Sequence, residues 1–144
     1  YTGKSLAQAT RLEASSLTQL DQLSAAYTDL SSWKAASEGA VDRSGELVQL
    51  LGCVGRSRAY GSFWAACMLA EGAVDTVVDA SLSFYEVAAL LPLIREAGGV
   101  ASTLEGDLPE HAGVSVTGVR PVSLVASNTA AVQQQVLEAL APRP

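Results

Sequence analysis

The chain has few of the residues on which metal sites and nucleic-acid interfaces are commonly built. It contains one histidine, two cysteines and only two lysines, Lys4 and Lys34, among 144 residues. Its 9 basic residues are outnumbered by 15 acidic ones, which gives a formal net charge of −6. Binding of a phosphate backbone requires clustered lysine and arginine. The sequence therefore argues against nucleic acid as a partner.

Long apolar runs are also scarce. The longest strongly apolar run without a charge spans residues 59–70, whereas a helix that crosses a bilayer needs about 20 residues. We therefore expect no membrane partner and a cytoplasmic location. The single methionine is Met68 and the chain begins at Tyr1. Because translation starts with methionine, we expect Tyr1 to follow a removed segment or to begin a piece of a longer protein.

Neither the cysteines nor the histidine form a metal or redox motif. Cys53 and Cys67 do not have the spacing of a C-x-x-C pair. Free cysteine is among the most buried residue types, so we predict two reduced thiols in the core. His111 lies among proline, glutamate and glycine residues and is predicted to be in a loop. A zinc site would lack a second histidine.

Apolar residues, in contrast, make up 49% of the chain. A domain of this length buries roughly 70% of its unfolded surface, so a real core is expected. No repeat or linker is visible, which indicates one domain or part of one. Strands are predicted at residues 24–30, 74–78, 100–104 and 122–126. Helices are predicted at residues 46–51, 62–71 and 83–97, and from the N-cap Asn128 to about Leu140. This alternation indicates an α/β layer with parallel or mixed strands.

Two of the predicted helices carry specific expectations. In one, Trp64, Cys67 and Met68 recur at the spacing i, i+3, i+4, which predicts one buried stripe. In the longest, Pro92 removes a backbone donor and predicts a kink. The apolar stripe continues through Pro92, so we expect a single helix there.

Three acids surround the predicted strand at residues 74–78. Asp75 and Asp79 flank it, and Glu86 opens the next helix. Ligands of open α/β sheets bind beyond the carboxyl ends of strands, so Asp79 and Glu86 could reach one cleft and offer carboxylates to Mg²⁺. Plainer explanations exist for each acid. Ser83 and Glu86 match a capping box. Asp79 fits a solvated turn, and Asp75 a turn or a strand edge.

The turn at residues 58–62 precedes a predicted helix. Gly61 permits a tight turn, and Ser62 suits the N-cap position. The free N–H groups of a helix start can hold an anion, and Arg56 and Arg58 would add positive charge. An ordinary capped turn explains the same residues, since neither phosphate-loop pattern, G-x-x-x-x-G-K or G-x-G-x-x-G, is present. No G-x-S-x-G motif supports nucleophilic catalysis.

Several segments occur in an order that is typical of one enzyme family. They are Ala70-Glu-Gly-Ala-Val-Asp75, Asp79, Phe84-Tyr-Glu-Val-Ala-Ala-Leu90 and Arg95-Glu-Ala-Gly-Gly-Val100. With this order and spacing, the chain resembles the inositol monophosphatase family, and most of all its bacterial histidinol-phosphate phosphatase branch. The turn at residues 58–62 and Leu124-Val-Ala-Ser-Asn128 resemble two further family motifs.

The resemblance implies a Mg²⁺-dependent phosphomonoesterase with a layered αβαβα fold. This chain would then be an α/β sandwich, with a mixed sheet flanked by helices. In the family an aspartate of a Trp-Asp pair binds metal, and Glu86 holds that position here. The acid seven residues earlier, here Asp79, contacts the substrate. The turn before the helix lines the substrate pocket, which implies substrate contacts for Arg58, Ser62 and Phe63.

The chain departs from the family in two respects. The Trp-Asp pair is Tyr85-Glu86, whose longer carboxylate suits octahedral Mg²⁺ less well. The family's first-half motifs, a Gly-Glu-Glu run and Asp-Pro-x-Asp-Gly-Thr, have no counterpart, since the chain contains no Asp-Pro and no Asp-Gly. We therefore predict that residues 1–144 form a single C-terminal half-domain without the metal-binding N-terminal half, and that no catalytic residue lies in this chain.

Two functions of different classes remain open. The first is the C-terminal part of a Mg²⁺-dependent phosphatase for a small sugar, inositol or amino-alcohol phosphate, with histidinol phosphate favoured and a nucleotide bisphosphate as a further possibility. The second is a non-catalytic homologue that acts as a binding or scaffold protein. A half fold exposes apolar surface. We therefore expect association with the N-terminal half of the same fold or with a second copy, and no turnover by this chain alone.

Overall fold

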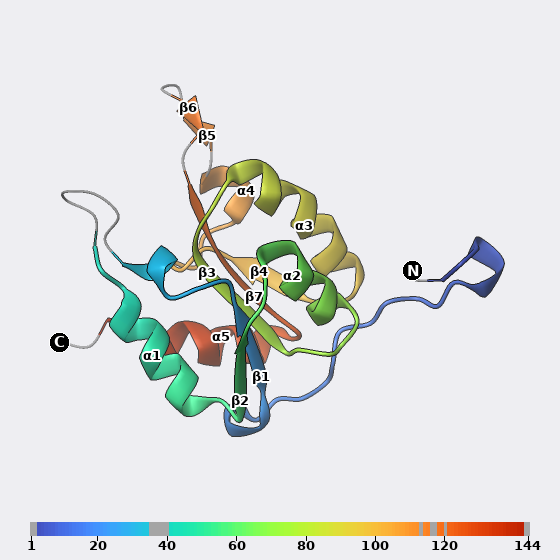
Figure 1. Cartoon of the computed structure of the whole chain (residues 1–144), viewed down its shortest axis with the longest axis horizontal. Helices are drawn as coiled ribbons and strands as arrows, with labels where there is room; N and C mark the ends of the chain where they lie inside the picture. Colours follow the sequence, from blue (N-terminus) through green and yellow to red (C-terminus); the bar gives the residue numbers. More distant parts are fainter. Residues whose placement is uncertain (1–2, 35–40, 113, 116–117, 120, 143–144) are drawn as a thin grey trace.

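A five-stranded sheet with helices on both faces forms the body of the molecule (Figure 1). The computed structural model describes residues 3–34, 41–112, 114–115, 118–119 and 121–142. The strands of the sheet are β1 (Ser24–Tyr27), β2 (Arg56–Ala59), β3 (Thr76–Leu82), β4 (Val100–Ser102) and β7 (Val122–Ser127). The longer helices are α1 (Ser44–Cys53), α2 (Ser62–Ala70), α3 (Phe84–Glu96) and α5 (Ala130–Ala139).

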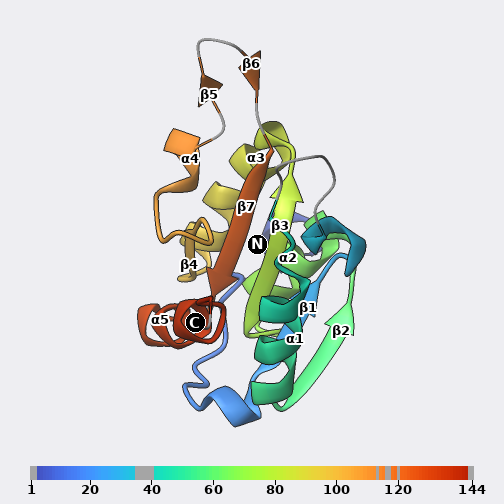
Figure 2. The same ribbon diagram turned by 90° about the vertical axis from the view of Figure 1, so that its left-hand side faces the viewer.

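The smaller elements lie around this body. They are the 3₁₀ turns Leu6–Gln8, Leu20–Gln22 and Ser31–Trp33, the short helix α4 (Pro109–Ala112), and the strands β5 (Val114–Ser115) and β6 (Gly118–Val119). The β5–β6 pair is antiparallel and projects beyond the main sheet (Figure 2). Among the described residues, no helix has the length and apolar character needed to cross a bilayer.

The sheet is mixed, in the order β2-β1-β3-β7-β4. Strands β2, β1 and β3 run parallel, while β7 is antiparallel to both β3 and β4. The carboxyl ends of β1 and β3 therefore meet at the same edge of the sheet. The prediction of a mixed sheet flanked by helices is confirmed. The edge strand β2 is not among the predicted strands, because its sequence RSRA is largely exposed and lacks the apolar alternation of a strand.

Two apolar layers hold the helices on the sheet. One lies under α2 and α3 and includes Leu69, Val77 and Ile94. The other lies under α1 and α5 and includes Trp33 and Val78. Neighbouring residues of β3 thus serve opposite faces, as alternation along a strand requires. Because helices cover both faces of the sheet, β3 carries buried apolar residues on both sides.

Helix α2 buries a different face from the predicted one. Its buried residues are Leu69 and the small Ala65, Ala66 and Ala70, whereas Trp64 is 57% exposed. Cys67 and Met68 are only half-buried. The stripe predicted from Trp64, Cys67 and Met68 is therefore wrong. Alanines allow a close approach of the helix to the sheet and of α2 to α3, and the bulky side chains then lie at the margin.

Further predictions concern the two cysteines, His111 and Pro92. Cys53 is exposed in the last turn of α1 and Cys67 is half-buried, so the prediction of two core thiols is wrong, although both are free. His111 lies in α4 rather than in a loop, because Pro109 suits the first turn of a helix. Pro92 lies inside α3 as predicted, and apolar residues on both sides of it are buried.

The start of α5 also differs from the prediction. Its N-cap is Thr129, whose side-chain Oγ1 accepts a hydrogen bond from the Val132 N–H at 3.2 Å. Asn128 is buried and turns its amide toward the N-terminal segment instead, donating to Ser15 Oγ and to the Leu17 carbonyl, both at 2.8 Å. Asn128 therefore ties the N-terminal segment to the end of β7.

Candidate active site at the carboxyl end of β3

Asp79 lies within β3 and is buried, with an exposed fraction of 1%. The alternative of a solvated turn acid is therefore wrong, because the strand continues to Leu82. Asp79 Oδ1 accepts a hydrogen bond from the Thr28 N–H at 2.9 Å. Thr28 directly follows β1, so this contact joins the carboxyl ends of two parallel strands. Ligands of α/β sheets commonly bind at such an edge.

The second oxygen of Asp79 has no partner. Among the described residues, neither Asp79 Oδ2 nor Thr28 Oγ1 makes a hydrogen bond, although both atoms are buried. Burial raises the pKa of Asp79 to about 6; the nearby hydroxyl and the backbone N–H of Thr28 oppose this shift, and the charges of Asp29 and Glu86 add to it. A buried polar atom without a partner costs free energy. Strongly shifted carboxyl groups of this kind cluster at functional sites.

Glu86 lies in the first turn of α3 and has a structural role. Ser83 and Glu86 form the predicted capping box, in which Glu86 Oε2 accepts from the Ser83 N–H at 3.0 Å. The Ser83 hydroxyl contacts the same oxygen. The positive end of the helix dipole favours a carboxylate here. Because its charge acts on Asp79, Glu86 lies at the same edge of the sheet, as the sequence predicts.

The residues of the predicted substrate wall are dispersed over two elements. Gly61, with an extended backbone, is the N-cap of α2. Ser62 is therefore the first helical residue and not the predicted N-cap, and its side chain lies outside the described part of the structure. Phe63 follows it and is 63% exposed. Arg58 lies on β2, in a pocket whose lining includes neither Asp79 nor Glu86.

Asp75 lies in the bend just before β3, in agreement with its prediction as a turn or strand-edge acid, and it is also buried. Its Oδ2 accepts from the Ser24 N–H at 2.6 Å, and its Oδ1 from the Ser15 hydroxyl. The Asn128 amide donates to the same Ser15 hydroxyl. These bonds connect the N-terminal segment to the starts of β1 and β3, which is a structural function.

Sequence reasoning missed Thr28 and Asp29. Asp29 accepts from the Ser31 hydroxyl at 2.5 Å and from the Ser32 N–H at 2.8 Å, and these bonds lower its pKa. It therefore stays ionised beside Asp79. Only the parallel pairing of β1 with β3 places residues 28 and 29 at this site. No spacing in the sequence could have signalled it.

The carboxylate oxygens at this edge of the sheet fit part of a metal site. Carboxylates are suitable ligands for Mg²⁺, but Glu86 Oε2 is already bonded by Ser83. Within the described ranges, no three His, Cys, Asp or Glu side chains lie close enough together to hold a metal ion. The described residues therefore fit the contribution of one ligand, not a complete metal centre.

The order of motifs and their place at the sheet edge agree with one known family. A sequence model of the inositol monophosphatase family matches residues 4–142. The chain belongs to the inositol monophosphatase family. The prediction of this family is thereby confirmed over nearly the whole chain.

Two relatives come from the histidinol-phosphatase branch of this family. The chain is 39% identical over 113 residues to a histidinol-phosphatase of Streptomyces coelicolor, an alignment that covers 78% of this chain and 41% of the relative. It is 39% identical over 106 residues to a histidinol-phosphatase of Mycobacterium tuberculosis, covering 74% and 39% respectively. The chain thus spans less than half the length of these relatives.

Solved structures of the inositol monophosphatase family share the fold. The chain matches an inositol monophosphatase from Zymomonas mobilis with a TM-score of 0.71 and 22% identity, covering 90% of this chain and 46% of that one. An Anabaena inositol monophosphatase matches with a TM-score of 0.69 and 17% identity, covering 90% and 47%. Both confirm the layered α/β architecture.

Proposed function

We propose that residues 1–144 are the C-terminal half-domain of a Mg²⁺-dependent phosphomonoesterase. The observation that carries the proposal is the buried, half-satisfied carboxyl group of Asp79 beside Glu86. These two acids occupy the family's substrate and metal positions at the carboxyl ends of β1 and β3. The remaining catalytic groups would come from an N-terminal half, in keeping with relatives more than twice as long as the matched region.

Asp79 is proposed to bind the non-phosphate end of the substrate. Its Oδ2 lacks a partner, so a substrate hydroxyl or ammonium group could donate to it. Above pH 6 Asp79 is largely ionised, and a charge-assisted hydrogen bond is about twice as strong as a neutral one. Asp29 adds negative charge beside it. This edge therefore favours a substrate with a positive group.

Glu86 is proposed to supply one metal ligand. A bound Mg²⁺ would polarise the phosphate and lower the pKa of the attacking water. The carboxylate of Glu86 is already oriented by Ser83, so it would not need to be ordered on metal binding. Ser62 and Phe63, at the start of α2, are proposed to form part of the substrate wall.

Histidinol phosphate is the favoured substrate, because it carries both an amine and a phosphate monoester. The names of the Streptomyces coelicolor and Mycobacterium tuberculosis relatives support it. Phe63, Trp64 and Tyr85 are exposed aromatic residues at the starts of α2 and α3. We propose that this surface packs against the N-terminal half or against a second copy of the chain.

A chimeric enzyme tests the proposed function. This chain would replace the matching region of the Streptomyces coelicolor relative, and phosphate release from histidinol phosphate would be measured with Mg²⁺. We expect release by the chimera and none by residues 1–144 alone. Asp79→Ala should lower kcat/KM about 100-fold, since it removes a substrate contact. Asp107→Ala, at an exposed acid distant in sequence, is the matched control.

The same chimera tests the metal ligand. Glu86→Ala should raise the Mg²⁺ concentration needed for half-maximal activity, whereas Glu86→Asp, which restores the family's residue, should keep or improve activity. A folded chimera without activity, beside a fully active parent, would contradict the proposal and favour the non-catalytic alternative. Turnover by this chain alone would contradict the division of the site between two halves.

A further inference from the structure

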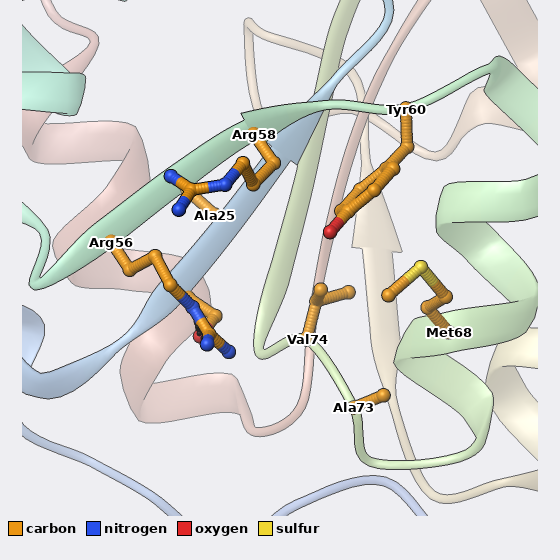
Figure 3. A pocket seen from close by; sticks show the side chains of 8 residues that line it. Ala25, Arg56, Arg58, Tyr60, Met68, Ala73 and Val74 are labelled. Carbon is orange, nitrogen blue, oxygen red and sulfur yellow. Dashed lines mark hydrogen bonds between the residues drawn. The ribbon is translucent and has the colours of Figure 1, made fainter.

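A second polar feature lies at the other end of β3 from the proposed active site. A pocket of about 70 Å³ opens beside the edge strand β2 and reaches the segment that leads into β3. Arg56 and Arg58 line one side, and Tyr60, Met68 and Val74 line the other (Figure 3). Neither Asp79 nor Glu86 contributes to the pocket.

The two arginines are oriented by neutral partners. Arg56 Nε and Nη2 donate to the Ser24 hydroxyl oxygen at 3.1 and 2.9 Å. Arg58 Nη1 donates to the carbonyl oxygen of its neighbour Ser57 at 2.7 Å. A guanidinium group has five N–H donors in a planar fork. Both groups therefore keep N–H donors that no atom of the described residues accepts.

Neither guanidinium contacts a carboxylate within the part of the chain that the structure describes. Arg43 and Arg95 differ, since each pairs with a glutamate. Arg56 and Arg58 are both exposed on the edge strand β2. Residues i and i+2 of a strand face the same side, roughly 7 Å apart. Their mutual repulsion would be relieved by an anion between them.

The surroundings favour a small anion. Figure 3 shows the Tyr60 hydroxyl pointing toward the space between the arginines and Val74, where it could donate a further hydrogen bond. A volume of about 70 Å³ holds roughly two water molecules at ~30 Å³ each, or one tetrahedral oxyanion. Met68 and Val74 exclude water from one side, which strengthens a charged contact there.

We propose that the pocket formed by Arg56, Arg58 and Tyr60 binds a small oxyanion, for which inorganic phosphate is the probe. Arginine suits this ligand because its fork matches two oxygens of a phosphate. The structure thus gives Arg58 an anion-binding position apart from Asp79. The proposal does not depend on the proposed phosphatase activity or on bound metal.

Titration of the ¹⁵N-labelled chain with phosphate, followed by NMR, tests this site. A chelator and constant ionic strength exclude a metal-mediated contribution from Asp79 and Glu86. We expect saturable shifts of the β2 amides with a dissociation constant of about 1–10 mM, a range typical of a small anion on an open site. Arg56→Ala and Arg58→Ala should each weaken binding at least about fivefold. Arg95→Ala, which changes an arginine of α3, should leave it unchanged.

Three outcomes would overturn the proposal. One is the absence of saturable shifts on β2 up to high phosphate. Another is equal affinity of the wild-type chain and both arginine variants, with folding verified by circular dichroism. The third is a phosphate response centred on Thr28 and Asp79, which would place the anion at the proposed active site. A loss of phosphatase activity in the chimera would have no bearing on this measurement.

Discussion

Asp75 directly precedes β3 and Asp79 lies within it, and both are buried, with exposed fractions of 4% and 1%. Each accepts a hydrogen bond from a backbone N–H at an end of β1, Ser24 for Asp75 and Thr28 for Asp79. Both oxygens of Asp75 are bonded, whereas Asp79 Oδ2 has no hydrogen-bond partner among the residues that the structure describes. The same residue type in the same sheet thus has two different environments.

This difference indicates a structural role for Asp75 and a ligand-binding role for Asp79. Asp75 connects the starts of two strands with the N-terminal segment, and all its capacity is used within the fold. Asp79 bonds the adjacent strand through one oxygen and keeps the other for a ligand. A buried carboxyl group with an unused oxygen lowers the stability of the fold, and such groups are retained where function needs them. The following predictions test this contrast, from the largest expected effect to the smallest.

Asp75→Ala should have the largest effect on stability. The substitution leaves the Ser24 N–H and the Ser15 hydroxyl without their acceptor in a partly buried place. A buried donor left without its acceptor costs about 1–3 kcal/mol, and this substitution leaves two such donors. Urea unfolding of both proteins measures the difference, with the exposed Asp107→Ala as control. A loss below about 1 kcal/mol would show that the Asp75 bonds contribute little.

Asp79→Asn should change how stability depends on pH. The pKa of Asp79 is raised from 3.8 to about 6 in the folded protein. Its contribution to stability is therefore present below pH 4 and is lost as the pH rises to 6. The lost amount is about 3 kcal/mol at 1.36 kcal/mol per pKa unit. Relative to wild type, Asp79→Asn should gain stability by up to that amount between pH 4 and 7.

Parallel urea curves at pH 4, 5, 6 and 7 provide this measurement. Since all other titrating groups are common to the two proteins, their effects cancel in the difference. A difference in unfolding free energy that does not vary with pH would disagree with the raised pKa of Asp79.

Asn128→Ala should destabilise the connection to the N-terminal segment more moderately. It removes two hydrogen bonds and leaves the Leu17 carbonyl and the Ser15 hydroxyl short of a donor. We expect a loss of about 2 kcal/mol and faster amide hydrogen exchange in residues 11–19. Gln134→Ala, an exposed residue bonded only to Glu138, is the control. Unchanged exchange in residues 11–19 would argue against the connection.

Glu86→Gln should have the smallest effect of these substitutions, which is a small change in the pKa of Asp79. It retains an acceptor for the Ser83 N–H but removes a negative charge that acts on Asp79. The pKa of Asp79 should fall by less than about one unit. A titration of Asp79 in both proteins measures the shift. A higher pKa in Glu86→Gln would show that the two charges do not interact as described.

The fold was largely predictable because its strongest signals are local. The apolar stripe of α3 and the capping box of Ser83 and Glu86 specify that helix in the sequence itself. The apolar residues of β3 and β7 identify them as buried strands. Strand β2 escaped prediction because tertiary pairing with β1, not its own pattern, makes it a strand.

The candidate site was predictable only in part. Asp79 and Glu86 follow from motif spacing, but the burial of Asp79 depends on β3 continuing to Leu82. Thr28 and Asp29 approach Asp79 only through the parallel register of β1 and β3. Such register is set by packing over the whole sheet, so no segment of the sequence encodes it alone.

The pKa of Asp79 tests the central contrast most directly. The carboxyl carbon of Asp79, labelled with ¹³C and assigned through Asp79→Asn, would be followed by NMR from pH 3 to pH 8 without divalent metal. The structure predicts a midpoint near pH 6, caused by burial with one oxygen unpartnered. A midpoint at or below the ordinary value of 3.8 would mean that Asp79 is solvated or fully bonded, and would contradict its assignment as the ligand-binding acid of β3.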